Sequence, residues 1–166
     1  MDLEMFWTFA SYFGDITFWL GAATVSMLLY KVVPRKVKKY LNWFVFALLP
    51  AVIVSYFLVT GMKFVFAIPR PCSGFFCPTD YSFPSGHAAV IFSVVTIFIM
   101  FFPRKTQMQL VLMLLAILVA YSRVALGLHR VVDVAGGAFI GIFTAVLIYI
   151  NYKEILKMIH EMKFDK

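Results

Sequence analysis

Five long stretches of this chain carry almost no charged side chains, and they restrict the possible folds more than any other feature of the sequence. About 20 apolar residues are needed to cross the hydrocarbon core of a bilayer. With 63% hydrophobic residues, a chain of 166 residues has more apolar surface than a globule of this size can bury. We therefore predict a single all-α domain over residues 1–166, a polytopic transmembrane bundle. Its expected spans are residues 15–33, 40–62, 85–103, 106–123 and 131–152.

The segments outside the spans differ in charge and in amphipathic pattern. Residues 1–14 begin with acidic residues and carry apolar side chains on one broad side, which favours a short helix in the membrane interface over a cleaved signal peptide. A frayed terminus is the alternative. Residues 63–84 connect the second and third spans and carry candidate site residues, and residues 153–166 form a basic tail.

The basic residues predict how the spans are oriented. Cytoplasmic connections of membrane proteins carry an excess of Lys and Arg, and most of the 15 basic residues here fall on one side of the five spans. They are Lys31, Arg35, Lys36, Lys38, Lys39, Arg104, Lys105, Lys153, Lys157, Lys163 and Lys166. We expect that side and the C-terminus to be cytoplasmic, with the N-terminus and residues 63–84 outside. The net charge of +7 then needs no nucleic-acid partner, because topology and contact with anionic membrane lipids explain it.

Most of the remaining basic residues lie with two histidines in three short patterns on the opposite face. The patterns are Lys-x6-Arg-Pro, Pro-Ser-Gly-His and Ser-Arg-x5-His-x3-Asp, at residues 63–71, 84–87 and 122–133. Ionisable groups at a membrane boundary are costly and by default mark a functional site. His129 and Asp133 are four residues apart, so in the first turn of a helix they share one face. The carboxylate can then fix the imidazole tautomer and leave the other ring nitrogen free to react.

Fixed positive charge in these patterns suits a phosphate group. Arg70 and Arg123 can each grip phosphate oxygens bidentately, and Lys63 adds a point charge. Ser85 and Gly86 begin the third span, so their backbone N–H groups are expected to face an anion at a helix N-terminus. We predict that these five residues bind phosphate.

The three patterns, in this order and with this spacing, resemble the signature motifs of the type 2 phosphatidic acid phosphatases, a family of membrane lipid phosphatases. The resemblance covers roughly residues 60–135. It implies that His129 attacks phosphorus to form a phosphohistidine, that Asp133 orients His129, and that His87 protonates the leaving oxygen. It also implies a phosphoric monoester hydrolase that uses no metal and no cofactor. Asp80 and Asp133 are the only acids near the motifs, too few for a two-metal site.

The substrate implied by the resemblance is a lipid phosphate at the extracytoplasmic leaflet of a bacterial inner membrane. The compact length resembles the small bacterial members, for which we favour phosphatidylglycerol phosphate or the 1-phosphate of lipid A, with undecaprenyl diphosphate as the alternative. A lipid-binding or transport protein that uses the same anion pocket is a different class, but it needs no oriented nucleophile. Vanadate-dependent haloperoxidases share the motifs but are soluble and larger.

Other residues near the motifs have two interpretations. Cys72 and Cys77 lie in an extracytoplasmic connection, where an oxidising compartment favours a disulfide over free thiols or a metal pair. Asp80 either shapes the mouth of the site or, as is more common for a loop aspartate, forms a turn. Arg130 either anchors its span at lipid headgroups, which we favour, or contacts substrate.

Three glycines fall on the last span. Small residues on a membrane helix allow a neighbouring helix to approach closely. We expect Gly136, Gly137 and Gly141 to bring this span close to the helix that ends at Ser122.

Overall fold

The computed structural model describes residues 3–72 and 77–164, and these residues form helices joined by short connections, without a strand. The predicted all-α bundle is therefore confirmed. In chain order the elements are α1 (Leu3–Ser11), a 3₁₀ turn η1 (Tyr12–Gly14), α2 (Ile16–Leu29), α3 (Arg35–Trp43), a π-helical segment η2 (Phe44–Leu48), α4 (Leu49–Phe66), α5 (Gly86–Phe101), α6 (Thr106–Ala125) and α7 (Val131–Phe164).

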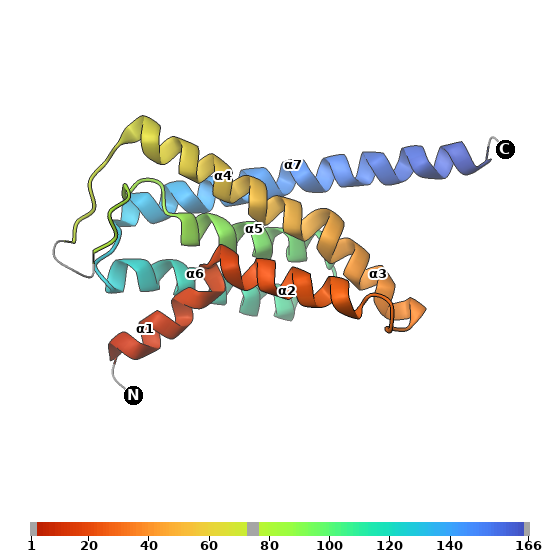
Figure 1. The fold of residues 1–166 in the computed structure, drawn as a ribbon, viewed down its shortest axis with the longest axis horizontal. Coiled ribbons are helices and arrows are strands. Elements are labelled where there is room, and N and C mark those ends of the chain that lie inside the picture. The colour runs from red at the N-terminus through yellow and green to blue at the C-terminus, as the bar shows by residue number, and fades with distance from the viewer. Residues whose placement is uncertain (1–2, 73–76, 165–166) are drawn as a thin grey trace.

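Helix α5 lies in the middle of the bundle (Figure 1). It packs most extensively against α7, and also against α4 and α6. The surrounding helices turn one face towards this centre and leave large apolar side chains outside, such as Phe57, Leu114 and Phe139. Such an exterior suits a bundle surrounded by lipid hydrocarbon. The main core consists of Trp43, Ala47, Leu48, Ala51, Val52, Val90, Val94, Ile97 and Ala145.

Two glycines of α7 lie directly against the backbone of α5. A Cβ atom at Gly137 would be 2.2 Å from the carbonyl oxygen of Ser85, and one at Gly141 would be 2.2 Å from that of Ala89. The absence of side chains therefore lets the two backbones approach closely. The predicted close packing is present at these two positions, but the predicted partner helix, the one that ends near Ser122, is wrong. Glycines show that a helix is closely packed without showing which neighbour it meets.

Three of the described helices are long and apolar enough to cross a membrane. They are Arg35–Phe66, which combines α3, η2 and α4, then Thr106–Ala125, and the part of α7 from Val131 to Glu154. The count reaches four if α1–η1 and α2, which meet at 54°, form one broken span. Helix α5 is apolar but has only 16 residues. The span predicted over residues 40–62 lies within the helix Arg35–Phe66, and the five spans and their bounds stay predictions.

The N-terminal segment folds along one side of the bundle. Helix α1 packs against α6, where the rings of Trp7 and Tyr121 meet edge to face with centroids 5.5 Å apart. The turn η1 packs against α5 so closely that a Cβ atom at Gly14 would lie 2.9 Å from both the Cβ and the carbonyl oxygen of His87. Residues 3–14 are helical, so a frayed terminus does not describe them. Their position in the membrane interface stays a prediction.

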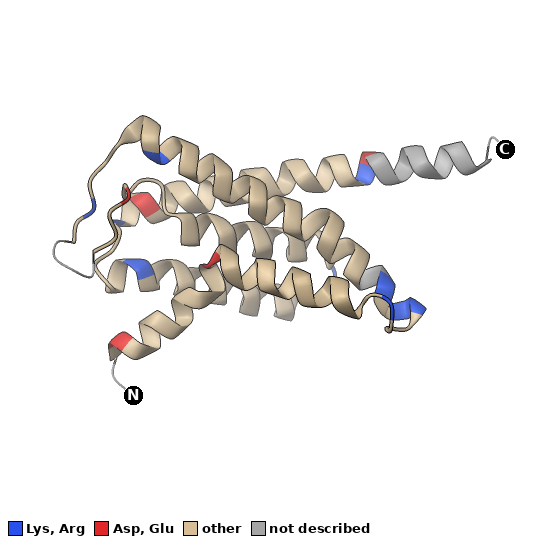
Figure 2. Cartoon of the chain, in the orientation of Figure 1, with Lys and Arg blue, Asp and Glu red and all other residues tan. Residues whose placement is uncertain are grey.

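Most of the Lys and Arg residues drawn in colour in Figure 2 gather towards the two ends of the bundle, and an acidic residue before α2 lies between the two groups. One group belongs to the end where α2 is followed by α3. The opposite end holds Lys63, Arg70 and Arg123, which line one cavity. The basic residues between α2 and α3, which we expect to set the orientation in the membrane, are therefore far from those that we expect to bind phosphate.

Candidate active site

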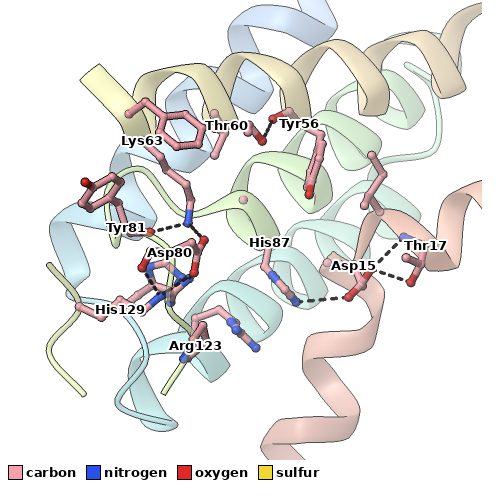
Figure 3. A pocket seen from close by; sticks show the side chains of 17 residues that line it. Asp15, Thr17, Tyr56, Thr60, Lys63, Asp80, Tyr81, His87, Arg123 and His129 are labelled. Carbon is pink, nitrogen blue, oxygen red and sulfur yellow. Dashed lines mark hydrogen bonds and ion pairs between the residues drawn. The ribbon is translucent and has the colours of Figure 1, made fainter. Parts of the chain in front are cut away.

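A cavity of about 550 Å³ lies where α4, α5 and α6 meet the connection 67–85 and the beginning of α2 (Figure 3). All three sequence patterns contribute side chains to it, although they are far apart in the chain. The predicted site residues in its lining are Lys63, Arg70, Gly86, His87, Arg123 and His129. Ser85 and Asp133 are buried beside these residues and contact them or each other.

A tight turn after α6 brings His129 to the cavity. Helix α6 ends at Ala125, and Gly127 follows with φ of +68°, a left-handed conformation that glycine adopts without steric cost. The N–H groups of Leu128 and His129 then both donate to the carbonyl oxygen of Arg123, at 3.1 Å each. The turn therefore ties His129 to the end of α6 just before α7 begins.

The imidazole of His129 is held from its Nδ1 side. The residue is 3% exposed, and Nδ1 lies 3.6 Å from Oδ2 of Asp133 in the first turn of α7 and 3.5 Å from Oγ of Ser82. Oδ2 of Asp133 accepts hydrogen bonds from Ser82 Oγ and, at 2.8 Å, from the N–H of Arg130. Our sequence analysis missed Ser82, for which the one available signal is its place two residues before the Pro-Ser-Gly-His pattern.

The environment of His129 favours the neutral imidazole. Burial, together with the positive charges of Arg70 and Arg123, lowers the pKa of His129 well below its ordinary value. A neutral imidazole with its Nδ1–H directed towards Asp133 has its lone pair on Nε2. A nitrogen in this state is able to attack an electrophile.

Asp80 lies among the basic side chains that the sequence predicts to bind phosphate. Its Oδ2 accepts a hydrogen bond from Lys63 Nζ at 2.5 Å, and its Oδ1 accepts from Arg70 Nε and Nη2 at 3.0 and 2.6 Å (Figure 3). Burial raises the pKa of Asp80, but the hydrogen bonds and charges of Lys63 and Arg70 outweigh this effect and lower the pKa below its usual range. The ionised carboxylate thus pairs with two of the side chains that are predicted to bind phosphate, a role that the turn interpretation does not explain.

Arg70 also reaches His129. Its Nη1 donates to the carbonyl oxygen of Leu128 at 2.9 Å and lies 3.0 Å from Nε2 of His129. The side chain of Arg70 is 7% exposed, whereas that of Asp80 is 52% exposed. Asp80 is therefore the partner that can move into solvent when another anion enters.

Two buried polar atoms near the cavity, Arg123 Nε and Ser85 Oγ, have no hydrogen-bond partner within the described part of the chain. Buried polar groups are normally hydrogen-bonded, so Arg123 Nε and Ser85 Oγ retain hydrogen-bonding capacity beside the cavity. The Ser85 N–H donates to the carbonyl oxygen of Asp133 at 2.9 Å. The prediction that this N–H faces phosphate is wrong, because it is used to join α5 to α7.

Asp15 lies beside His87, away from His129 (Figure 3). Its Oδ2 is 3.9 Å from Nε2 of His87, and its Oδ1 accepts hydrogen bonds from the N–H and Oγ1 of Thr17 at 2.8 and 2.7 Å. Our sequence analysis missed Asp15 because the residue stands outside the three patterns. The Asp-x-Thr sequence predicts only a helix N-cap.

The connection that carries Arg70 and Asp80 contains a disulfide between Cys72 and Cys77. The sequence favoured this pairing over free thiols. Among residues 3–72 and 77–164, no three His, Cys, Asp or Glu side chains are placed to hold a metal ion together. Independence from metal stays a prediction that needs a chelator to test it.

A helical bundle with apolar outer faces defines this protein as a polytopic integral membrane protein, with a cavity lined by basic side chains at one end. The model of the PAP2 superfamily matches residues 44–157. The chain therefore belongs to the PAP2 superfamily.

Several curated proteins are similar to part of the chain. Undecaprenyl-diphosphatase of Sulfolobus acidocaldarius is 35% identical over 86 residues, which cover 51% of this chain and 41% of that protein. The bacitracin transport permease protein BcrC of Bacillus licheniformis is 35% identical over 83 residues, 50% of this chain and 39% of that protein. Phosphatidylglycerophosphatase B of Bacillus subtilis is 35% identical over 78 residues, which cover 42% of this chain and 38% of that protein. The matches span about two fifths of these relatives.

Two crystal structures have a similar fold. One is a transmembrane PAP2 type phosphatidylglycerolphosphate phosphatase from Bacillus subtilis, with a TM-score of 0.71 at 23% identity, covering 92% of this chain and 78% of that one. The other is Aquifex aeolicus LpxE, with a TM-score of 0.65 at 28% identity, covering 89% of this chain and 85% of that one. Both likenesses cover most of this chain.

Proposed function

We propose that the chain is a membrane lipid phosphatase that releases phosphate from an anionic lipid through a phosphohistidine intermediate on His129. The observation that carries this proposal is the orientation of one imidazole. Nδ1 of His129 faces Asp133, while Nε2 lies 3.0 Å from Arg70 Nη1 in the cationic cavity. A pocket that only held an anion would need the cations but not a buried, oriented imidazole.

In the first step, the lipid phosphate displaces the Asp80 carboxylate and is held by the three cations of the cavity. The Nε2 lone pair of His129 attacks phosphorus, and an N–P bond forms while the bond from phosphorus to the lipid oxygen breaks. That oxygen takes the Nε2 proton of His87 and leaves as the lipid alcohol. The cations stabilise the charge that develops on the phosphoryl oxygens.

In the second step, water enters on the side vacated by the lipid. His87, now neutral, takes a proton from the water while the water oxygen attacks phosphorus. The N–P bond breaks, its electron pair returns to Nε2 of His129, and inorganic phosphate leaves. His87 is again protonated and His129 again neutral, so the cycle closes without another reactant.

The substrate class is a lipid with a terminal phosphate or diphosphate. We favour phosphatidylglycerol phosphate or the 1-phosphate of lipid A, and the name of the Bacillus subtilis relative supports the first of these. Undecaprenyl diphosphate is the second candidate, supported by the names of relatives from Sulfolobus acidocaldarius and Escherichia coli. With a diphosphate, the leaving group is the lipid monophosphate instead of an alcohol.

We assign the site to the extracytoplasmic side of the membrane. The basic connection between α2 and α3 is at the other end of the bundle and follows the positive-inside pattern. The disulfide next to Arg70 suits an oxidising compartment. Labelling Cys72 and Cys77 with a membrane-impermeant thiol reagent, in cells treated with reductant, tests this assignment. Lack of labelling in intact cells, with labelling after lysis, would overturn it.

The proposed activity is tested by phosphate release from phosphatidylglycerol phosphate, lipid A, undecaprenyl diphosphate and phosphatidic acid in detergent micelles. We expect turnover of at least one lipid at an undiminished rate in EDTA, because no step requires a metal. If the protein binds anionic lipid but releases no phosphate from any of the four, it is a lipid-binding or transport protein. The relative named as a bacitracin transport permease makes that outcome a specific alternative.

Replacing Asp80 by Asn is expected to strengthen the binding of free phosphate or vanadate by about tenfold. The carboxylate competes with these anions for Lys63 and Arg70, and losing about 1.4 kcal/mol of competing charge-assisted hydrogen bonds corresponds to a factor of ten. The measurement is the inhibition constant of each anion. Glu4→Gln, the same change at an exposed position of α1, is the control. Weaker inhibition of the Asp80 variant would mean that Asp80 instead organises the cations.

A further inference from the structure

Asp15 combines two contacts that together direct one carboxylate oxygen at His87. Oδ1 is fixed by the N–H and Oγ1 of Thr17, so the carboxylate caps α2 and cannot rotate freely. Oδ2 remains and faces His87 Nε2 at 3.9 Å. A helix cap alone would use one oxygen and would not require the second to face a histidine.

The packing of η1 fixes this arrangement independently of the cap. Gly14 lies against the backbone of His87, where a Cβ atom would be 2.9 Å from its Cβ and its carbonyl oxygen and 2.9 Å from Cγ1 of Val119. The residue after Gly14 is Asp15. The same close contact that only glycine permits therefore places the Asp15 carboxylate next to the His87 ring.

The other charged groups around His87 are mostly positive. The titratable and charged groups that face it across the cavity come from the start of α2, from α4, from the connection 67–85, from α6 and from the turn before α7. They are Asp15, Tyr56, Lys63, Arg70, Asp80, Tyr81, Arg123 and His129. Asp80 is paired with Lys63 and Arg70, so Asp15 is the carboxylate available to balance a proton on His87.

We propose that Asp15 is a positioning residue for His87, which holds the protonated imidazole in the cavity and directs its Nε2–H towards the leaving oxygen. This inference rests on the proposed phosphatase function. A distance of 3.9 Å is within ion-pair range but too long for a hydrogen bond. The carboxylate therefore stabilises the imidazolium without taking the Nε2–H that the lipid oxygen needs. Asp15 lies outside residues 44–157, the part of the chain that the superfamily model matches.

The role of Asp15 should depend on the leaving group. An alkoxide such as the lipid oxygen must be protonated as it leaves, whereas a nitrophenolate leaves without a proton. Loss of the Asp15 charge should therefore slow the release of phosphate from a lipid phosphate monoester more than from p-nitrophenyl phosphate. It should also move the alkaline limb of the pH–rate profile for the lipid, where His87 loses its proton, to lower pH.

The experiment compares wild type, Asp15→Asn, Asp15→Glu and Glu4→Gln in detergent with both substrates across pH. Asn is as good an N-cap as Asp, so Asp15→Asn removes the charge but keeps the start of α2. We expect kcat for the lipid to fall by about tenfold, kcat for p-nitrophenyl phosphate to change less than about twofold, and the alkaline limb to move down by about one pH unit. Asp15→Glu keeps a carboxylate, so its alkaline limb should lie close to the pH at which that of wild type lies. Glu4→Gln, an equal charge change on exposed α1, should match wild type.

Two results would overturn the inference. Equal loss with both substrates and an unmoved pH limb would mean that Asp15 supports the local structure of the site without acting on the proton of His87. Unchanged kinetics would mean that Asp15 has no role in the reaction. Failure of the proposed function is distinct, because wild type itself would then release no phosphate from either substrate, and the inference would fall with it.

Discussion

Replacing His129 by Ala is expected to lower phosphate release by at least about 10⁴-fold, because the side chain that forms the covalent bond to phosphorus is removed. Nothing else in the cavity can take over this role, since the second histidine, His87, is needed as acid and base. The three cations remain, so phosphate and vanadate should still bind. The expected result is therefore a protein that binds anions and releases no phosphate.

Two measurements separate this loss of chemistry from a loss of folding. Phosphate release is followed in micelles with EDTA, and binding of vanadate is followed by thermal stabilisation of the same protein. Val132→Ala is a suitable control, because Val132 lies three residues after His129, in the first turn of α7, is 68% exposed and does not line the cavity. Turnover by His129→Ala close to that of the control would exclude a phosphohistidine on this residue.

Replacing Gly137 by Ala is expected to destabilise the bundle and to reduce activity together. The added Cβ would lie 2.2 Å from the carbonyl oxygen of Ser85 and 3.0 Å from Cβ of Ala88. Because Ser85 O belongs to the backbone, α5 and α7 must separate, which typically costs about 1–3 kcal/mol of unfolding free energy. His87 follows two residues later, and displacing a catalytic group by about 1 Å can lower the rate about 100-fold.

Gly61→Ala in α4 is the matched control for this variant. No atom lies within 4 Å of a Cβ atom built at Gly61. Ala also favours a helix over Gly by about 1 kcal/mol, so this control should be neutral or stabilising. Unfolding temperature in detergent and phosphate release are measured for both variants. Equal behaviour of the two would show that α5 and α7 are not held at the distance described above.

The sensitivity of Gly137 reflects how Asp133 links the site to the fold. The Asp133 carboxylate lies 3.6 Å from Nδ1 of His129, and its backbone carbonyl oxygen accepts the Ser85 N–H at 2.9 Å. One residue at the start of α7 thereby connects the proposed nucleophile to the helix that carries His87. Close packing of α5 on α7 fixes the position of His87 relative to His129 across the cavity.

Much of the site could be predicted from local spacing. His129 and Asp133 are four residues apart, a spacing that predicts contact when both residues lie on one helix. In the structure α7 begins at Val131, so His129 lies in the turn before it, and its Nδ1 is still only 3.6 Å from Asp133 Oδ2. Lys63, Arg70 and Arg123 were identified because cations are rare at such positions in an apolar chain and need a reason to be there. The tertiary structure places all three in the lining of one cavity.

The contacts that local spacing could not predict join distant segments of the chain. Ser82 reaches Asp133, and Asp80 reaches Lys63, across a connection whose path no periodic pattern describes. Asp15 meets His87 only because η1 packs on α5.

The sequence by itself determined that this chain is an all-helical membrane protein of the PAP2 type, because hydropathy and motif spacing are local properties of the chain. Only the tertiary structure decided which helix the glycines of α7 meet, where the Ser85 N–H goes, and which acids join the cations. These are outcomes of helix packing, in which several neighbours satisfy the same apolar pattern. Shape and backbone hydrogen bonding then select one of them.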